Sequence, residues 1–423
     1  MVVAIATLGA CGVRTPSTRT SLTPAYSTSA MTPASSATEV SAMGVAGALN
    51  SPSASATASA TASAPASASA PASAPPPSFS ALPFERRFDA WVAKEKPPSA
   101  AIVVVSEGEP LMTKVVGLRD LASKQPATSR TLYRIASITK TFTAETLLSL
   151  GLDLDVPAET YLPELAKVQA PPKTPRFTLR QMMNHTSGFP RNGDFDYTKR
   201  VPREADLLDP LWKTAVQFTP GSRWSYSNYA VSLLGIVIAR HAVEKSYREA
   251  VARVVLRPLA MSDTTFDPSS LPNAEVATGY VRRGEQIRLG PWKLGASEAA
   301  GGLWSSIDDM AKYLAFAIDV WGVRSDVVAW KSVERCEGHR LLRHAGALDG
   351  FQSIIGVLPS QRIGFVALTN VSDLELEGLL ASLVEEASPC PTAPRTSRTA
   401  PARGSRARPA PHRARGGPSS PRS

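Results

Sequence analysis

Residues 134–144 read Arg134-Ile-Ala-Ser-Ile-Thr-Lys-Thr-Phe-Thr-Ala144, and within them Ser137 and Lys140 are the residues that carry chemistry. If a helix begins at Ser137, a spacing of three places its hydroxyl and the Lys140 amine on one face, within side-chain reach. Serine is a weak nucleophile at neutral pH, but a lysine withdrawn from water loses its proton more easily and can accept the serine proton. The pattern alone equally describes a solvated polar pair, so its meaning depends on the sequence downstream.

A second candidate element is Tyr226-Ser227-Asn228, within the phrase Pro220-Gly-Ser-Arg-Trp-Ser-Tyr-Ser-Asn-Tyr229. A tyrosine beside a lysine can carry a proton, and an asparagine amide can hold both the lysine and a substrate carbonyl. The alternative is a turn before a helix, with Asn228 as the N-cap.

A third element, Leu342-Arg-His-Ala-Gly-Ala347, is expected on a sheet strand beside the site. Gly346 would let a substrate approach the backbone closely, and the backbone N–H groups of Ala347 and Ser137 would form an oxyanion hole. The alternative for His344 is a packed or exposed histidine without a functional role.

The apolar pattern predicts strands at both ends of a helical middle. Helical spacing is expected at 84–92, 229–242, 246–256 and 374–386, and strands at 101–106, 111–116, 353–358 and 363–369. This order predicts an α/β (α+β) fold, with one antiparallel sheet built from N- and C-terminal segments and a helical subdomain inserted between them. The helix of Ser137 would lie at their junction, where pockets are common.

The three elements, in this order, resemble the penicillin-recognising serine hydrolases related to class C beta-lactamases, DD-peptidases and beta-lactamase-like, family VIII-type esterases. Four further stretches resemble the same family. They are Met183-Asn-His-Thr-Ser-Gly-Phe-Pro190, Trp224-Ser-Tyr-Ser-Asn-Tyr229, Arg257-Pro-Leu-Ala-Met261 and Ala299-Ala-Gly-Gly-Leu-Trp-Ser-Ser306. The resemblance covers about Phe84 to Glu386 and implies a beta-lactamase/transpeptidase-like fold.

The resemblance also implies roles for individual residues. Ser137 would form an acyl-enzyme, Lys140 and Tyr226 would manage its proton, and water would then release the acid. Asn228, His344 and Gly346 would bind the substrate, with His344 at a position where many relatives carry lysine. His185 would be structural, and this chemistry needs no metal or organic cofactor. Whether Lys140 or Tyr226 is the acylation base is left open, because coupled groups titrate as a pair.

Departures from the family pattern bear on the substrate, a small molecule or peptide that carries an acyl group. Ala345 replaces a hydroxyl residue that would help to bind a substrate carboxylate, which favours neutral esters or amides and hence a beta-lactamase-like esterase. A DD-carboxypeptidase or class C-like beta-lactamase is the alternative within the fold. The helix after Lys140 and the chain between Tyr313 and Arg343 are short for the family, which would impair folding or widen the site. A catalytically silent, surface-tethered binding protein is therefore a third hypothesis.

Composition divides the 423 residues into four parts. Residues 1–11 are apolar and end in Leu8-Gly-Ala-Cys11, which resembles a lipobox with Cys11 as the lipidated residue; an ordinary apolar N-terminus is the alternative. Residues 12–83 are rich in Ser, Ala, Thr and Pro and predict a disordered tether, and residues 84–387 predict the hydrolase domain. Residues 388–423 predict a basic disordered tail. Together these features favour a bacterial cell envelope protein, periplasmic or held at a membrane by a lipid anchor.

The net charge of +10 comes mainly from the tail, which holds eight arginines and no acidic residue and leaves residues 84–387 near +1. The tail lacks aromatic residues for base stacking, so we expect no nucleic-acid partner. The cysteines, Cys11, Cys336 and Cys390, show no metal-ligand spacing, so no metal site is expected. Only Cys336 lies inside the predicted domain, and we therefore expect no disulfide framework.

Overall fold

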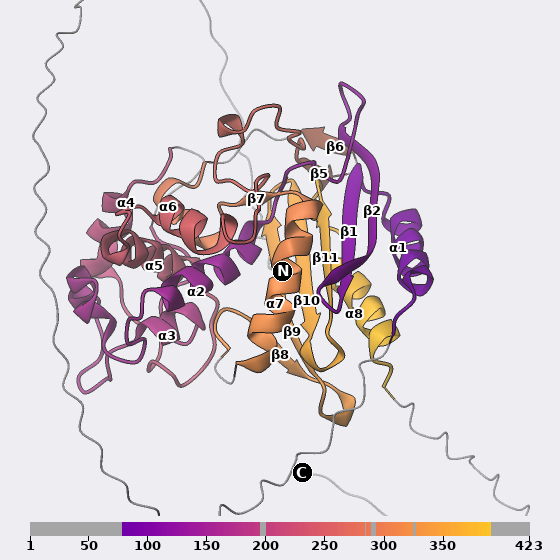
Figure 1. Cartoon of the computed structure of the whole chain (residues 1–423). Helices are drawn as coiled ribbons and strands as arrows, with labels where there is room; N and C mark the ends of the chain where they lie inside the picture. Colours follow the sequence, from indigo (N-terminus) through magenta and orange to yellow (C-terminus); the bar gives the residue numbers. More distant parts are fainter. Residues whose placement is uncertain (1–77, 195–199, 284, 289–292, 325–326, 391–423) are drawn as a thin grey trace, which may run out of the picture. The chain divides into compact units, whose positions relative to one another are not determined.

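The computed structural model describes residues 78–194, 200–283, 285–288, 293–324 and 327–390 (Figure 1). In this part of the chain the strands form a seven-stranded sheet, in the order β3-β2-β1-β11-β10-β9-β8, and two small two-stranded sheets, β4-β7 and β5-β6. The strands are β1 (Ser99–Ser106), β2 (Glu109–Asp120), β3 (Gln125–Pro126), β4 (Tyr133–Arg134), β5 (Tyr280–Arg283), β6 (Glu285–Arg288), β7 (Trp304–Ser305), β8 (Lys331–Glu334), β9 (Arg340–Leu348), β10 (Phe351–Leu358) and β11 (Ile363–Thr369).

Helices and helical turns make up most of the chain between β4 and β7. The α-helices are α1 (Ala81–Glu95), α2 (Thr139–Ser149), α3 (Leu179–Met183), α4 (Glu204–Leu208), α5 (Asn228–His241), α6 (Tyr247–Val251), α7 (Ile307–Val323) and α8 (Leu376–Ala387). The short turns are η1 (Ala136–Ile138), η2 (Ala158–Thr160), η3 (Pro163–Lys167), η4 (Asp209–Lys213), η5 (Ala252–Leu256), η6 (Pro268–Ser270), η7 (Gly295–Ala300), η8 (Cys336–Gly338) and η9 (Pro359–Gln361).

The large sheet joins the two ends of the domain. Strand β1 pairs antiparallel with β2 on one side and with β11 on the other, in a register that runs from Ala100 opposite Thr369 to Ser106 opposite Ile363. Strand β11 then pairs with β10, and β10 with β9. The predicted antiparallel sheet from N- and C-terminal segments is confirmed, and so are the predicted strands in β1, β2, β10 and β11.

Successive side chains of β1 point to opposite faces of the sheet, so that β1 contributes to two separate cores. Val103 and Val105 belong to the core on the face of α7, whereas Ile102 and Val104 belong to the core on the face of α1 and α8. This follows from the period of two along a strand, and it explains why β1 is apolar without interruption. Figure 1 shows α7 lying across one face of the sheet and α1 and α8 on the other.

The nucleophile helix lies between the sheet and the helices of the inserted region. α2 is buried from Thr139 to Leu147, and Phe142 stacks on Tyr313 of α7 with ring centroids 3.9 Å apart. A helix covered on all sides shows little amphipathic pattern, which matches this sequence. The predicted helix start is corrected: α2 begins at Thr139, and Ser137 lies in the preceding 3₁₀ turn η1.

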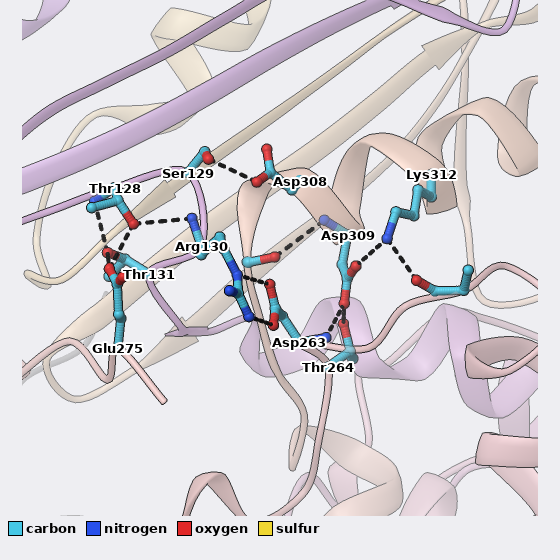
Figure 2. Close-up of polar contacts among 12 residues, drawn as sticks. Thr128, Ser129, Arg130, Thr131, Asp263, Thr264, Glu275, Asp308, Asp309 and Lys312 are labelled. Carbon is cyan, nitrogen blue, oxygen red and sulfur yellow. Dashed lines mark hydrogen bonds and ion pairs between the residues drawn. The ribbon is translucent and has the colours of Figure 1, made fainter. Parts of the chain in front are cut away.

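A polar network fixes the chain that leads into η1, as Figure 2 shows. The Arg130 guanidinium makes two hydrogen bonds to the Asp263 carboxylate, at 2.7 and 3.0 Å, and Ser129 Oγ donates to Asp308 of α7 at 2.7 Å. Buried Asp309 accepts from Lys312 Nζ at 2.8 Å and from the loop that carries Asp263. These bonds tie the segment before the nucleophile to the N-terminal turn of α7.

A disulfide joins Cys336 in η8 to Cys390, which follows α8. Arg335 strengthens the same junction: its Nη2 donates to the Ser388 carbonyl at 2.9 Å and to Glu385 Oε2 at 3.0 Å. The expectation of no disulfide is therefore wrong. It placed Cys390 in the tail, whereas the turn after α8 brings Cys390 back to the β8–β9 connection.

Breaking this disulfide is expected to destabilise the domain. The crosslink spans 54 residues, for which the chain-entropy model gives about 4 kcal/mol. We expect Cys390→Ser to lower the free energy of unfolding in urea by about 2–4 kcal/mol under oxidising conditions. The double variant Cys336→Ser/Cys390→Ser should lose no more than the single one, and an unchanged unfolding midpoint in the single variant would contradict the assignment.

Several predictions concern residues outside the described ones, namely the lipobox with Cys11, most of the tether and residues 391–423 of the tail. The predicted boundary between tether and domain, after residue 83, falls inside α1, which begins at Ala81. Residues 81–83, Ala-Leu-Pro, resemble the preceding Ala- and Pro-rich sequence in composition. In the described residues we find no helix with the length and apolar character needed to cross a membrane. The same residues contain no cluster of three or more His, Cys, Asp and Glu side chains suited to a metal ion.

Candidate active site

Ser137 and Lys140 lie together where the helical region meets the sheet. Lys140 Nζ is 3.2 Å from Ser137 Oγ, and the lysine is fully buried, whereas the serine is partly exposed. Ala136, directly before the serine, has a φ of +45°, a left-handed conformation that an alanine adopts at a cost of about 1–3 kcal/mol. The strained turn presents the hydroxyl outward while its helix stays buried.

The Lys140 amine has two further contacts, both with acceptors. It donates to Asn228 Oδ1 at 2.9 Å and to the backbone carbonyl of Ala300, the last residue of η7, at 2.5 Å. Burial lowers the pKa of this amine below its usual value of 10.5; Tyr226 opposes the shift and Arg191 reinforces it. The third contact, to Ser137 Oγ at 3.2 Å, is also a donated hydrogen bond while the amine is protonated, so loss of that proton would direct the lone pair at the serine.

Tyr226 contacts the serine from the other side, since its hydroxyl donates to Ser137 Oγ at 2.9 Å. Two cations approach its ring: Lys140 Nζ is 5.0 Å and Arg191 Cζ 5.3 Å from the ring centroid. Their attraction to the ring helps to hold the phenol in place. The start of α5 positions Tyr226 just before the helix, and Ser227 is the N-cap, because its Oγ accepts from the Ala230 N–H at 2.9 Å. The alternative with Asn228 as the cap is therefore wrong.

Asn228 is oriented by a residue that the sequence did not point to. Its Nδ2 donates to Asn192 Oδ1 at 3.1 Å, which leaves Oδ1 facing Lys140. Its backbone N–H donates to the Arg191 carbonyl at 2.8 Å. The segment that follows the His-Thr-Ser-Gly-Phe-Pro stretch therefore supports the second element, and one residue of it, Arg191, brings a cation to the site.

His185 packs against the ring of Tyr226, and among the described residues its side-chain hydrogen bond goes to the segment of Tyr226 and not to Ser137. Its ring centroid is 4.2 Å from that of Tyr226, and its Nδ1 accepts from the Ser227 N–H at 3.2 Å. Its carbonyl accepts from the Ser225 N–H at 2.8 Å. These contacts are those of a residue that positions the tyrosine, a more specific role than the structural one expected from the sequence.

His344 lies on β9 with its side chain almost fully buried. Its Nδ1 donates to the carbonyl of Ala345 at 2.9 Å, which leaves Nε2 of the neutral ring as a hydrogen-bond acceptor. Burial lowers the pKa of His344 to about 3, and the charge of Lys140 adds to the effect. The position that carries lysine in many relatives therefore holds a neutral group here.

Gly346 is the point at which β9 touches the nucleophile turn. A Cβ at this position would lie 2.2 Å from Ser353 Oγ and 2.3 Å from the Ile135 carbonyl, and Ser353 Oγ donates to that carbonyl at 2.8 Å. The strand of Ala347 and the turn of Ser137 are thus in contact. The oxyanion hole from their two backbone N–H groups stays a prediction.

The two buried histidines give a prediction about pH. Burial lowers the pKa of His185 to about 2 and that of His344 to about 3, from 6.5. As pH falls below 6.5 the unfolded chain binds protons that the folded chain does not, so the free energy of unfolding falls. We expect lower stability toward urea at about pH 5 than at about pH 7.5, and a smaller difference for His344→Gln. Equal pH dependence in the variant and the unchanged protein would contradict this.

One component of the site consists of backbone carbonyl groups and was not predicted from the sequence. η7 supplies the Ala300 carbonyl to Lys140 and the Ala299 carbonyl to Thr143 Oγ1, at 2.8 Å. The stretch 299–306 was singled out by resemblance, but nothing in its residue types indicates a lysine acceptor. A carbonyl contribution depends on the path of the backbone, which the sequence does not display.

Comparison with known proteins gives the family. The Beta-lactamase family model matches residues 84–387. Protein flp of Staphylococcus aureus is 26% identical over 301 residues, which cover 65% of this chain and 60% of that protein. Human putative beta-lactamase-like 1 is 29% identical over 272 residues, covering 56% of this chain and 54% of its own length. The chain therefore spans less than two thirds of these curated relatives.

A solved structure shows the same fold. The octameric penicillin-binding protein homologue from Pyrococcus abyssi superposes with a TM-score of 0.59 and 23% identity, over 73% of this chain and 77% of that one. The predicted beta-lactamase/transpeptidase-like fold is thereby confirmed. Proteins of the beta-lactamase and penicillin-binding protein type are generally serine hydrolases. With its family model matched from residue 84 to residue 387, the chain belongs to the beta-lactamase family.

Proposed function

We propose that this protein is a serine hydrolase that works through an acyl-enzyme on Ser137, and that it acts as a beta-lactamase-like esterase. The observation that carries the proposal is the set of contacts around Lys140. Asn228 Oδ1 and the Ala300 carbonyl accept from the amine, and its third neighbour is Ser137 Oγ at 3.2 Å, toward which the deprotonated amine would direct its lone pair. A buried amine arranged in this way is a base aimed at the serine proton.

The reaction follows from these positions. Ser137 Oγ attacks the substrate carbonyl and its proton passes to Lys140, while the backbone N–H groups of Ser137 and Ala347 would hold the oxyanion. The Tyr226 hydroxyl then gives a proton to the leaving oxygen, and the proton on Lys140 replaces it. The carbon–oxygen bond to the leaving alcohol breaks and the acyl group stays on Ser137. In the second half of the reaction water attacks the acyl carbonyl, its proton follows the same route in reverse, and Ser137 is released together with the acid.

The substrate class rests on β9. Ala345 is exposed beside the site and presents a methyl group, so this position offers no hydroxyl to a substrate carboxylate. His344 is neutral because its pKa is lowered to about 3. Neutral esters, with amides as slower substrates, suit these two residues.

One observation favours a second candidate, a DD-carboxypeptidase or class C-like beta-lactamase acting on peptidoglycan peptides or beta-lactams. The exposed Arg191 guanidinium lies over Tyr226, and none of the described acidic residues pairs with it. An arginine at the rim of the site could bind a substrate carboxylate. The two candidates differ in which substrates acylate Ser137.

The test is the intact mass of the full chain after brief mixing with p-nitrophenyl butyrate or with a penicillin, alongside Ser137→Ala. A butyryl increment or rapid ester turnover that is lost in Ser137→Ala supports the esterase. A stable penicilloyl adduct without ester turnover supports the peptidase. A folded protein that shows neither adduct nor turnover would be the catalytically silent binding protein.

The proposal includes location at the bacterial cell envelope with a lipid on Cys11. The disulfide between Cys336 and Cys390 supports it, since such bonds persist in oxidising compartments. Labelling of cells with a palmitate analogue tests the anchor, and label that survives Cys11→Ala would refute it.

A further inference from the structure

A cavity of about 490 Å³ lies beside the nucleophile, between the helical region and the end of the sheet. Tyr226 and His344 line it and also belong to the site. By area the rest of its wall is mostly apolar, with Trp224, Val327 and Trp330 among the residues that supply it. Polar and charged residues also line it, namely Asn184, His185, Lys331, Ser332, Arg343 and Glu377. Trp330 belongs to the connection between α7 and β8, part of the segment that is short for the family.

We infer that this cavity binds the leaving group of the substrate, and that the leaving group is an uncharged aromatic alcohol. The inference rests on the proposed function and deepens it.

The position of Tyr226 assigns the cavity to the leaving group rather than to the acyl group. The leaving oxygen needs a proton as its bond to the carbonyl carbon breaks, and the donor must come within hydrogen-bond reach of it. Lys140 is fully buried, whereas Tyr226 is partly exposed, contacts Ser137 Oγ at 2.9 Å and lines the cavity. A leaving group that receives the Tyr226 proton therefore extends into the space behind that hydroxyl.

The walls indicate a flat apolar group. Trp224 is 63% exposed, an unusual state for a tryptophan, and its ring centroid lies 6.1 Å from that of Tyr226 and 5.8 Å from that of His185. Trp330 is buried against Trp321, with centroids 6.1 Å apart, so it forms a fixed wall. Aromatic faces of this kind bind aromatic ligands better than they bind alkyl chains of equal area.

The charges near the cavity favour an uncharged ligand. Arg343 forms an ion pair with Glu377, so the two charges on that wall cancel. His344 is buried without a charged hydrogen-bond partner, and Ala345 brings no polar group. Lys331 is exposed on β8, an edge strand, where water solvates its amine.

The experiment uses the full chain and three butyrate esters, which share one acyl group. Phenyl and 2-naphthyl butyrate have leaving groups of similar acidity but different area, and 4-carboxyphenyl butyrate adds a negative charge. We expect kcat/KM to be about tenfold higher for the naphthyl ester than for the phenyl ester, and lowest for the carboxyphenyl ester. Trp224→Ala should remove most of the naphthyl preference. Trp212→Ala is the matched control, because Trp212 is 64% exposed on η4 and does not line the cavity.

A binding measurement separates failure of this inference from failure of the proposed function. 2-Naphthol should bind Ser137→Ala saturably, as read by the fluorescence anisotropy of the naphthol, and more weakly when Trp224→Ala is added. Equal kcat/KM for the phenyl and naphthyl esters, or a naphthyl preference that Trp224→Ala leaves intact, would overturn the inference. Preference for the carboxyphenyl ester that is lost in Lys331→Met would overturn it in favour of an anionic leaving group. Absence of all ester turnover would overturn the proposed function, and naphthol binding would then decide the cavity alone.

Discussion

Lys140→Met is expected to lower kcat/KM for p-nitrophenyl butyrate by about 10³-fold, the range found when a general base is removed. Methionine matches lysine in length and has no lone pair suited to accept the Ser137 proton. The variant also loses the hydrogen bond from Lys140 to Asn228 Oδ1, which helps to hold Asn228 in place. Stopped-flow acylation would show the loss in the first turnover, before water enters the reaction.

Stability should change much less than activity in this variant. Asn228 Oδ1 and the Ala300 carbonyl each lose a donor, at about 1–3 kcal/mol for an acceptor left buried without one. Against this, a fully buried amine is replaced by an apolar group that packs well. Lys167→Met, at an exposed position in η3, is the matched control and should leave kcat/KM unchanged. Acylation at an undiminished rate in Lys140→Met would leave Tyr226 as the base.

Gly346→Ala is expected to have the largest effect on the site without changing any polar side chain in it. The added Cβ would lie 2.3 Å from the Ile135 carbonyl, which is backbone and cannot rotate away, and 2.2 Å from Ser353 Oγ. Either β9 or the turn of Ser137 has to move. We expect a loss of about 3 kcal/mol in the free energy of unfolding, together with at least about 10²-fold in kcat/KM because the nucleophile and the oxyanion donors lose their register.

The comparison variant is Gly322→Ala in α7. A Cβ there would meet the Pro359 side chain at 3.1 Å, and alanine favours a helix over glycine by about 1 kcal/mol. Urea unfolding and ester kinetics on both variants separate a general cost of a methyl group from the local contact at Gly346. If Gly346→Ala kept both stability and activity, β9 would not press against the nucleophile turn as described.

The parts of the fold that the sequence predicted are those with a strong local pattern. β1 and β11 are uninterrupted apolar runs, and α5 is a long apolar helix with a serine N-cap. β8 was not predicted, because Lys331-Ser-Val-Glu334 is short and polar, as an edge strand often is. α7 is also absent from the predicted elements, although Ser306 before Asp309 and the apolar run that follows carry the signal of a capped helix.

In the site, too, some residues could be predicted from the sequence and others could not. Ser137, Lys140, Tyr226 and Asn228 could be predicted because each supplies a side chain with its own chemistry, and the structure brings all four together. The Ala300 carbonyl, the Asn192 amide and the approach of Arg191 depend on how two separate segments, η7 and residues 191–192, come to the site. The pairing of Cys336 with Cys390 could not be predicted for the same reason, because it depends on the turn after α8 bringing two distant cysteines together.

The pairing of β1 with β11 has a consequence for the order in which the protein can fold. β1 is among the first segments of the domain to be synthesised and β11 among the last, so the centre of the sheet has no partner until nearly the whole domain exists. Closing so long a loop makes the rate-limiting step slow, and the apolar β1–β2 hairpin must wait exposed meanwhile. A nascent chain that ends before Ile363 therefore holds β1 with one edge unpaired, although β2, α1 and α7 are already present.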